Sequence, residues 1–369
     1  MKFTCKAEAL NKAIQTVLKA IISKPSTPIF SGIHIIALEN MVQLEAMDLN
    51  MAISSTMEAE VAEQGEIVVS AKYLSELIRK FSTETITVTK NTAEKVIYIS
   101  SPKSEFKLLL MNEDDFPKFP SFNGDKFIDI EDEKFKELIK KTIYACSNDE
   151  ARPLFTGILF DVNDSKITCV GTNTHRLAIK TVEQANAEAM NIIIPSKVLA
   201  EIARNLNSDV PQNVKISLLN NQIMVVIDNT TIVSRLIEGK FPDYRRVIPP
   251  KFNVTAKVNI KELASAVDRV SLFSNDGEYS IIKFNINGNV MTLSSSSPVS
   301  GTGKEEIPCE SNGENLNVAF NSQYIVDILK NLEATEAVMS LNTSLSPVCI
   351  TAVDDDSYIY IATPVRVVF

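Results

Sequence analysis

Histidine is scarce in this sequence: only His34 and His175 occur among its 369 residues. Neither has a second potential ligand at the spacing that zinc sites use. His34 lies in an apolar run and is expected to be structural. One alternative is a metal-dependent hydrolase that uses His175 together with nearby acidic residues. That alternative predicts bound metal and turnover, so a metal analysis would distinguish it.

The motifs of catalytic sites are missing as well. The run from Gly301 to Lys304 looks like part of a phosphate-binding loop, but Pro298 replaces its first glycine and Glu305 replaces its serine or threonine. The aspartates at 354–356 separate two strand-like runs, so a solvated hairpin turn explains them better than a metal site. No nucleophile and base stand out as a pair. These absences predict a protein that binds rather than catalyses, and no cofactor is expected.

Cysteine pairs and long apolar runs are also missing. Residues 1–6 lack the apolar core of a signal peptide, and no apolar run reaches the roughly 18 residues of a membrane span. We therefore expect a cytoplasmic protein with no membrane partner. The cysteines are odd in number and form no C-x-x-C pair, which favours buried free thiols in a reducing compartment. They are Cys5, Cys146, Cys169, Cys309 and Cys349.

What the sequence does contain is an internal repeat. A Phe-Pro corner closes the first third between Asp114 and Pro120, and a second closes the middle third between Gly239 and Pro249. Short strand-like runs alternate with amphipathic helices throughout. Leu77, Ile202 and Ile328 fall at matching places in these helices, about 125 residues apart.

The repeat predicts an α+β fold built from three tandem domains. Each domain should contain two helices backed by antiparallel sheets, an arrangement that covers one face of the strands and leaves the other to water. The predicted domains are residues 1–122, 123–250 and 251–369.

The predicted helices share one charge pattern. Lysine and arginine recur on the polar faces of all six, whereas acidic residues fall more often in strands and turns. Solubility alone explains any single basic face, but the recurrence favours a basic surface for DNA. The net charge of −9 is compatible with such a surface if it is local. A further alternative is a monomeric repeat scaffold that binds proteins through its sheets and ignores DNA.

Three stretches of the sequence resemble one known family. They are Thr172-Asn173-Thr174-His175-Arg176-Leu177-Ala178, the run KFPDYRRVIP at 240–249, and Thr363-Pro364-Val365-Arg366. The N-terminal run at 1–4 and the run at 69–72 add to the likeness. With the triplication, these stretches make the whole chain similar to the bacterial DNA polymerase III beta subunits, the beta sliding clamps.

The resemblance implies a non-catalytic processivity subunit of a DNA polymerase. Two copies would form a head-to-tail homodimer, a ring of six domains that encircles duplex DNA without sequence preference and tethers the replicative polymerase. The other implied partners are the DNA polymerase III alpha subunit, the clamp loader complex with its delta subunit, other DNA polymerases, mismatch repair proteins and ligase.

Members of this family bind short peptides in a cleft between the second and third domains. Apolar walls suit Leu and Phe side chains, while Arg and His at the edges fix the peptide backbone. The positions that the resemblance carries over are Phe155, Thr172, His175, Arg176, Leu177, Pro242, Arg246, Val247, Asn321, Tyr324, Leu345, Pro347, Thr363, Pro364, Val365 and Arg366.

The chain departs from the family pattern around this cleft. Asn173-Thr174 replaces the usual Asp-Gly, Thr363 replaces a larger apolar residue, and the ending Val367-Val368-Phe369 differs from the usual one. The first change predicts a narrower groove floor. All of them concern peptide preference more than the existence of the cleft.

Two further surfaces are implied by the resemblance. Ring closure would pair an edge strand of the first domain with the end of a helix in the third, which is a sensible use of an exposed apolar edge. Its residues are Phe106, Leu108, Leu272 and Phe273. For the DNA contacts themselves we expect Lys24, Lys72, Arg79, Lys136, Lys140, Arg152 and Lys197.

Overall fold

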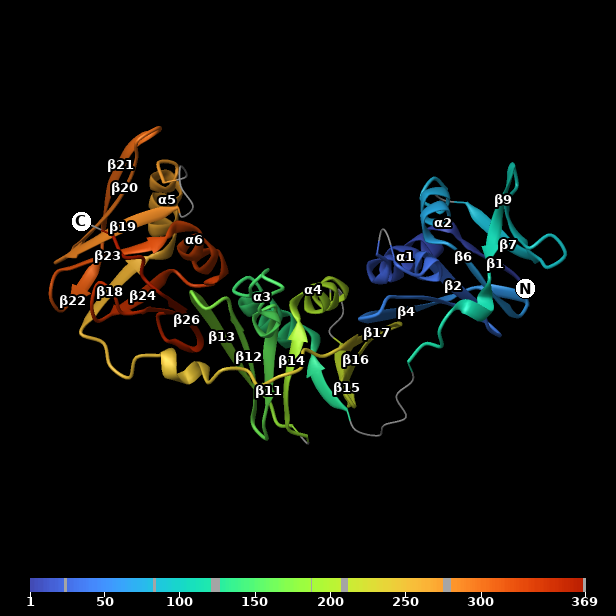
Figure 1. Cartoon of the computed structure of the whole chain (residues 1–369), viewed down its shortest axis with the longest axis horizontal. Helices are drawn as coiled ribbons and strands as arrows, with labels where there is room; N and C mark the ends of the chain where they lie inside the picture. Colours follow the sequence, from blue (N-terminus) through green and yellow to red (C-terminus); the bar gives the residue numbers. More distant parts are fainter. Residues whose placement is uncertain are drawn as a thin grey trace. The chain divides into compact units, whose positions relative to one another are not determined.

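The computed structural model describes residues 1–22, 25–81, 84–120, 127–186, 188–206, 212–274 and 280–367 (Figure 1). The chain divides into two compact units. Unit 1 contains Met1–Glu133 and Glu201–Leu236, and unit 2 contains Lys134–Ala200 and Ile237–Phe369. Each unit therefore holds one whole predicted domain and part of the middle one.

The described residues form six α-helices, and each helix follows directly on a strand. Apolar side chains at helical spacing explain them, as in the first helix, where Leu10, Ile14 and Val17 are all buried. The asparagines that precede the last two helices cap them. The Asn259 side chain accepts hydrogen bonds from the backbone N–H groups of Lys261 and Glu262, and the Asn321 side chain accepts one from that of Gln323. The helices are α1 Ala7–Val17, α2 Ala71–Ile78, α3 Asp132–Ile143, α4 Ser196–Asn205, α5 Ile260–Ser271 and α6 Ser322–Asn331.

Unit 1 is organised around one antiparallel sheet of 13 strands. Strands from the first and middle thirds of the chain meet in it where Thr230–Arg235 pairs with Met51–Glu58. In sheet order the strands are β10 Ile128–Glu131, β15 Asn213–Leu219, β16 Gln222–Ile227, β17 Thr230–Arg235, β4 Met51–Glu58, β3 Met41–Met47, β2 Gly32–Ala37, β6 Gly65–Ser70, β9 Ser104–Met111, β8 Val96–Ser101, β7 Thr85–Asn91, β1 Lys2–Lys6 and β5 Glu60–Glu63.

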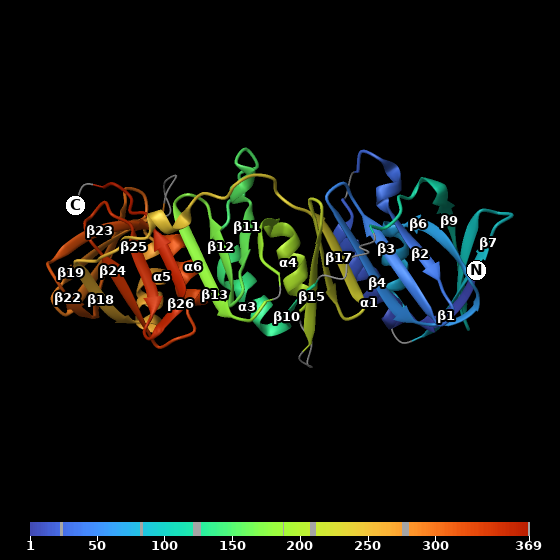
Figure 2. The same ribbon diagram turned by 90° about the horizontal axis from the view of Figure 1, so that it is seen from below.

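Unit 2 contains a nine-stranded and a four-stranded antiparallel sheet. In the larger one, β13 pairs with β26, so the middle and last thirds of the chain share one sheet (Figure 2). Its strands in order are β14 Met190–Pro195, β11 Gly157–Val162, β12 Lys166–Thr172, β13 Arg176–Glu183, β26 Asp355–Ala362, β25 Val348–Ala352, β24 Glu336–Leu341, β18 Val254–Asn259 and β22 Glu310–Asn312. The smaller sheet contains β21 Gly301–Pro308, β20 Val290–Ser297, β19 Ile281–Asn287 and β23 Leu316–Asn321.

The predicted repeat is confirmed by the order of these elements. The strands that lead into α2, α4 and α6 begin at Gly65, Met190 and Leu316, and those that lead into α1, α3 and α5 recur at a similar interval. Helices backed by antiparallel strands make the fold α+β, as expected. The exact domain boundaries stay a prediction.

Lys141 is buried, although the lysines of the predicted helices were expected on exposed polar faces. It lies in α3, with only 3% of its surface exposed. Its ammonium donates to the backbone oxygen of Asn331, lies 3.4 Å from a carboxylate oxygen of Glu333, and sits 5.4 Å from the centre of the Tyr358 ring. A buried charge needs such partners, so Lys141 stabilises packing between α3 and the last third of the chain.

All five cysteines are free, and four of them are buried. Burial raises the pKa of Cys5 and of Cys146 to about 12. These thiols therefore stay protonated at neutral pH and behave as small apolar side chains.

His34 in β2 is held between two carboxylates. Its Nδ1 lies 3.0 Å from Glu45 and its Nε2 2.8 Å from Glu66, and its ring packs on Phe116 with the ring centres 5.0 Å apart. Burial lowers the pKa of His34, but the hydrogen bonds and charges of the two glutamates outweigh burial, so the net pKa is raised. The His34 ring thus joins three strands of unit 1, β2, β3 and β6.

The raised pKa of His34 predicts a pH-dependent stability. Its contribution is fully present below the ordinary histidine pKa of about 6.5 and is lost as pH rises through the raised value. Relative to a His34→Gln variant, the free energy of unfolding of the unaltered protein should therefore fall with rising pH. Urea unfolding of both proteins between about pH 5.5 and about pH 8.5 measures this. A difference that does not change with pH would contradict the account.

Candidate functional site

Unit 2 contains an apolar groove of about 250 Å³. It lies where the turn between β12 and β13 and the end of β26 meet the segment around the short 3₁₀ helix Tyr244–Val247. Every residue that lines it belongs to unit 2. They are Phe155, Thr172, Thr174, His175, Arg176, Leu177, Phe241, Pro242, Asp243, Tyr244, Val247, Pro347, Ile361 and Thr363.

The turn between β12 and β13 is fixed by its own side chains. The Asn173 Oδ1 accepts hydrogen bonds from the backbone N–H groups of His175 and Arg176, both at 3.0 Å. The Thr172 Oγ1 accepts from Thr174 N at 3.1 Å and donates to Arg176 O at 2.7 Å. Thr174 is left with a φ of 78°, a conformation that is unusual for a β-branched residue.

The opposite wall is built by the Phe-Pro-Asp-Tyr-Arg-Arg run. Phe241 and Tyr244 are buried, and Phe241 meets Phe155 edge to face with ring centres 6.4 Å apart. The run is entered through Gly239, whose φ is 132° and where a Cβ would lie 2.7 Å from the Leu154 side chain. Glycine is therefore required at this corner.

The rim of the groove combines charge with exposed apolar surface. Arg246 points outward and pairs with Asp243 at 3.0 Å, while 49% of Val247 is exposed. His175 is tied by its backbone oxygen, which accepts from the N–H and hydroxyl groups of Thr363 at 2.9 and 3.0 Å. The C-terminal segment therefore closes one end of the groove.

Arg176 extends from the groove into the seam between β13 and β26. Its side chain is 11% exposed and forms an ion pair with Asp327 at 2.5 Å. It also donates to the backbone oxygen of Tyr144 and lies 4.7 Å from the centre of the Tyr324 ring. Burial lowers the pKa of Arg176, but Asp327 outweighs this and the net pKa is raised. Within unit 2, the guanidinium therefore joins the middle third of the chain to the last third.

The structure brings together nine of the sixteen residues that the sequence assigned to the peptide cleft. Those that line the groove are Phe155, Thr172, His175, Arg176, Leu177, Pro242, Val247, Pro347 and Thr363. The other seven do not line it, namely Arg246, Asn321, Tyr324, Leu345, Pro364, Val365 and Arg366.

Those seven residues have other positions. Asn321 caps α6, and Tyr324 stacks on Arg176. Leu345 is 56% exposed in the turn after β24. The backbone N–H of Val365 donates to Ala319 at 2.7 Å, so the C-terminal segment runs beside β23 rather than across the groove.

Five residues that line the groove were missed by the sequence reasoning. Four of them lie inside the motifs quoted in the sequence analysis, so those motifs already contained the signal for them: Thr174, Phe241, Asp243 and Tyr244. Ile361 was hidden in an apolar run of alternating residues, and only the pairing of β13 with β26 shows which face of that strand it takes.

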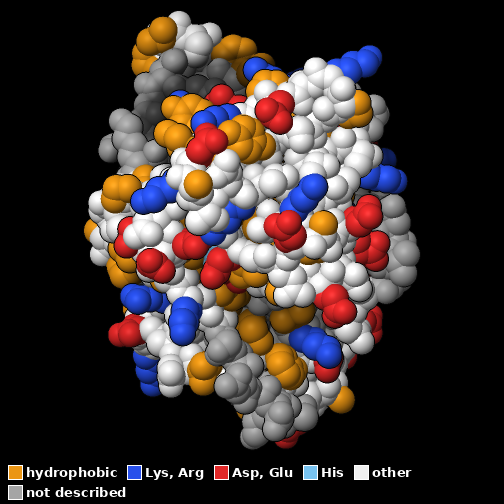
Figure 3. Space-filling model, turned by 90° about the vertical axis from the view of Figure 1, so that its right-hand side faces the viewer, with side chains coloured by type: hydrophobic (Ala, Val, Ile, Leu, Met, Phe, Trp, Pro, Cys, Tyr) orange, Lys and Arg blue, Asp and Glu red, His pale blue; other side chains and the backbone are white. Residues whose placement is uncertain are grey.

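The residues assigned to ring closure lie on strand β9, for Phe106 and Leu108, and at the end of helix α5, for Leu272 and Phe273. On β9, Phe106 is 40% exposed and packs edge to face on Phe81, and this strand meets β6 only at Leu110 and Met111. Among the described residues β21 pairs only with β20. Leu272, beside it, is 65% exposed, and Phe273 packs against Gly303. Figure 3 shows one face of the molecule, on which hydrophobic side chains stand in small groups among charges of both signs.

The residues assigned to DNA contact are mostly exposed, but several already have acidic partners. Lys140 pairs with Glu333 at 2.9 Å, Arg152 with Asp149 at 3.0 Å, and Lys197 with Glu150 at 3.3 Å. Lys72 and Arg79 are exposed on and beside α2, and Lys136 is half-buried. Lys24 lies outside the described residues.

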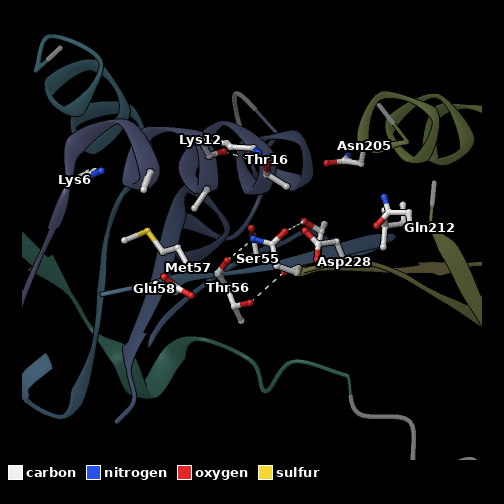
Figure 4. Close-up of a pocket in the computed structure, with 15 residues that line it drawn as sticks. Lys6, Lys12, Thr16, Ser55, Thr56, Met57, Glu58, Asn205, Gln212 and Asp228 are labelled. Carbon is white, nitrogen blue, oxygen red and sulfur yellow. Dashed lines mark hydrogen bonds between the residues drawn. The ribbon is translucent and has the colours of Figure 1, made fainter. Parts of the chain in front are cut away.

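Unit 1 contains a larger, polar hollow of about 600 Å³ (Figure 4). Lys12 and Thr16 of α1 approach it from one side and Asp228 from the other. Its floor is closed by Asn229, whose Nδ2 donates to Thr56 O at 2.5 Å. Charged side chains of both signs line this hollow together with apolar ones, so it is more polar than the groove.

No helix in the described part of the chain is long and apolar enough to cross a membrane. In the same residues, no three His, Cys, Asp or Glu side chains are grouped so that they could hold a metal ion.

Comparison with known proteins gives one consistent result. Family models for the N-terminal, central and C-terminal domains of the DNA polymerase III beta subunit match residues 1–120, 129–243 and 245–366. The beta sliding clamp of Bacillus subtilis is 32% identical over 99% of this chain and 100% of its own. That of Staphylococcus epidermidis is 31% identical over 99% of both chains.

Solved structures agree with the sequence matches. A DNA polymerase sliding clamp from Bacillus subtilis superposes with a TM-score of 0.96 at 30% identity, covering 100% of both chains. The DNA polymerase III subunit beta from Pseudomonas aeruginosa gives a TM-score of 0.94 at 27% identity, again over 100% of both.

The conformation of Thr174 predicts that glycine would be more stable at this position. A non-glycine residue held at positive φ costs of order 1–3 kcal/mol, of which the greater freedom of unfolded glycine offsets part. Thr174→Gly should therefore raise the free energy of unfolding by about 1 kcal/mol. Urea unfolding tests this, with Thr92→Gly as the control, because Thr92 is an exposed turn residue without positive φ. Equal destabilisation by both changes would show that Thr174 is not strained.

Proposed function

The chain belongs to the family of DNA polymerase III beta subunits, the beta sliding clamps, and on this premise we propose that two copies close head to tail into a ring around duplex DNA. The family is that of a non-catalytic accessory subunit of DNA polymerase. In this role the ring tethers the replicative polymerase to its template, and partner proteins dock in the groove of unit 2.

The observation that supports docking most directly is the groove itself. Leu177, Phe241 and Ile361 form an apolar floor, which provides affinity for Leu and Phe side chains. The rim offers His175 and the exposed Val247. Because the turn and the C-terminal segment are hydrogen-bonded in place, the groove is preformed and a peptide alone pays the ordering entropy.

The partners proposed for this groove share one chemistry, a short peptide with large apolar side chains. We assign to it the DNA polymerase III alpha subunit, the clamp loader with its delta subunit, other DNA polymerases, mismatch repair proteins and ligase. All of them would compete for one site, so only one partner can occupy the groove of a given chain at a time.

The two open edges support ring closure. An edge strand with exposed apolar side chains invites pairing with another chain. Here β9 and β21 belong to different units and differ in sequence, so their pairing is a heterologous, head-to-tail contact. Two such contacts close a dimer and cover these two edges in both chains.

The cations on the helices support contact with DNA. The pairs Lys140–Glu333 and Lys197–Glu150 are exposed, and exposed pairs contribute little to stability. A phosphate can therefore replace the glutamate at small cost. Contacts of this kind do not read bases, which suits a protein that must move along any sequence.

Ring closure is tested by a double substitution on β9. Phe106→Ala with Leu108→Ala removes apolar contact area from one side of each proposed interface, so light scattering should report monomers where the unaltered protein gives dimers. Leu219→Ala is the control, because Leu219 is 43% exposed on a different strand. A double variant that stays fully dimeric would refute the assigned interface.

Peptide docking is tested at the rim of the groove. A fluorescein-labelled peptide with adjacent Leu and Phe residues should bind the protein, and Val247→Asp should weaken this binding about tenfold, the equivalent of about 1.4 kcal/mol. The reason is that the new carboxylate must lose water against an apolar ligand. Val290→Asp is the control, since Val290 is 41% exposed on β20. Equal anisotropy titrations for the two variants would overturn the proposal.

A further inference from the structure

Unit 1 contains a second apolar hollow, of about 230 Å³, which the proposed function does not use. It lies where the turn between β3 and β4 meets the end of β17 and the first Phe-Pro corner. Met47, Val233 and the half-buried Phe30 provide apolar walls. All of its lining residues belong to unit 1.

This hollow is the repeat-related counterpart of the groove. For nine of its fourteen lining residues, the residue 125 positions later lines the groove of unit 2. Phe30 corresponds in this way to Phe155, and Pro117 to Pro242. The hydrophobic clusters beneath correspond too, since Phe116 packs below one and Phe241 below the other.

The turn beside the hollow has the same construction as the turn beside the groove. The Asp48 Oδ1 accepts from the backbone N–H groups of Asn50 and Met51, both at 2.7 Å, just as Asn173 does in unit 2. At the position of Thr174, this turn carries Leu49, which is 63% exposed. The turn therefore adds apolar surface to the rim.

The two sites differ in charge. Lys118 occupies the position of Asp243, and Arg235 ends β17 at the other side of the hollow. Both side chains are exposed, and neither has an ion pair within the described part of the chain. In the groove, by contrast, Arg176 is neutralised by Asp327. The hollow therefore combines an apolar floor with two available cations.

We propose that this hollow is a second peptide-docking site, and that it binds a short extended peptide in which large apolar side chains stand next to carboxylates. The proposal rests on the proposed function of the groove, because the likeness of the two sites is meaningful only if the groove binds peptides. The methionines adapt to apolar side chains of different shape, and Lys118 and Arg235 pair with the acids. A second site lets one chain hold two partners at once.

Methionine methyl NMR tests this directly. Met47 and Met51 line the hollow, whereas no methionine lines the groove. The full chain is labelled with ¹³C in the methionine methyl groups, and Met47→Leu and Met51→Leu assign the two signals. The probe is the peptide acetyl-Asp-Leu-Phe-Asp-amide, with acetyl-Lys-Leu-Phe-Lys-amide as its matched control.

The expected result is a saturable shift of both signals with the acidic probe and no saturable shift with the basic one. Lys118→Glu with Arg235→Glu should weaken the acidic probe at least about tenfold, as expected for lost charged contacts. Both residues are exposed, so the fold should survive. In the Val247→Asp variant, which impairs only the groove, the shifts of Met47 and Met51 should remain.

Three results would overturn the proposal. The first is that both signals stay fixed while the acidic probe displaces the labelled peptide from the groove; in that case the proposed function stands and this inference falls. The second is that the shifts disappear in Val247→Asp. The third is that the signals move on diluting the protein without peptide, which would make the hollow a contact between copies. If the labelled peptide binds nowhere, the proposed function itself fails.

Discussion

The pairing of β13 with β26 is the contact on which the site depends. It joins residues 176–180 to residues 358–362 and makes one sheet from two repeats. The groove lies at one end of this seam, with its turn on one strand and Ile361 on the other. Arg176 crosses the seam to Asp327, and removing one partner of a buried ion pair typically costs about 3–5 kcal/mol. The seam therefore fixes the shape of the groove.

The repeat uses the same device in unit 1. There β17 pairs with β4, and Met51 stands where Arg176 stands in unit 2. The arginine brings specificity and needs buried partners, whereas the methionine needs none. The β13–β26 and β17–β4 pairings thus have a similar backbone arrangement but different side chains. The two repeats therefore share a hollow at this place and differ in its charge.

Sequence reasoning predicted the repeat, the fold class and much of the groove, because these depend on local patterns. Apolar spacing gives the helices, and Phe-Pro corners mark the ends of the repeats. It could not place Lys141, whose exposure depends on Asn331 and Tyr358 far along the chain. It also assigned Tyr324 and Val365 to the cleft; Tyr324 stacks on Arg176 beside the groove and Val365 is hydrogen-bonded to β23, and neither lines the groove itself. Side-chain direction across a seam is a tertiary property that no local pattern contains.

The central claim is that the chain functions as a closed dimeric ring. Sedimentation equilibrium of the unaltered protein over a wide concentration range tests it most directly, because encirclement requires closure. The account predicts a mass of two chains that holds down to low concentration. A mass of one chain at every concentration would contradict it. The fold and the groove would then stand, but the chain would not encircle DNA as a ring.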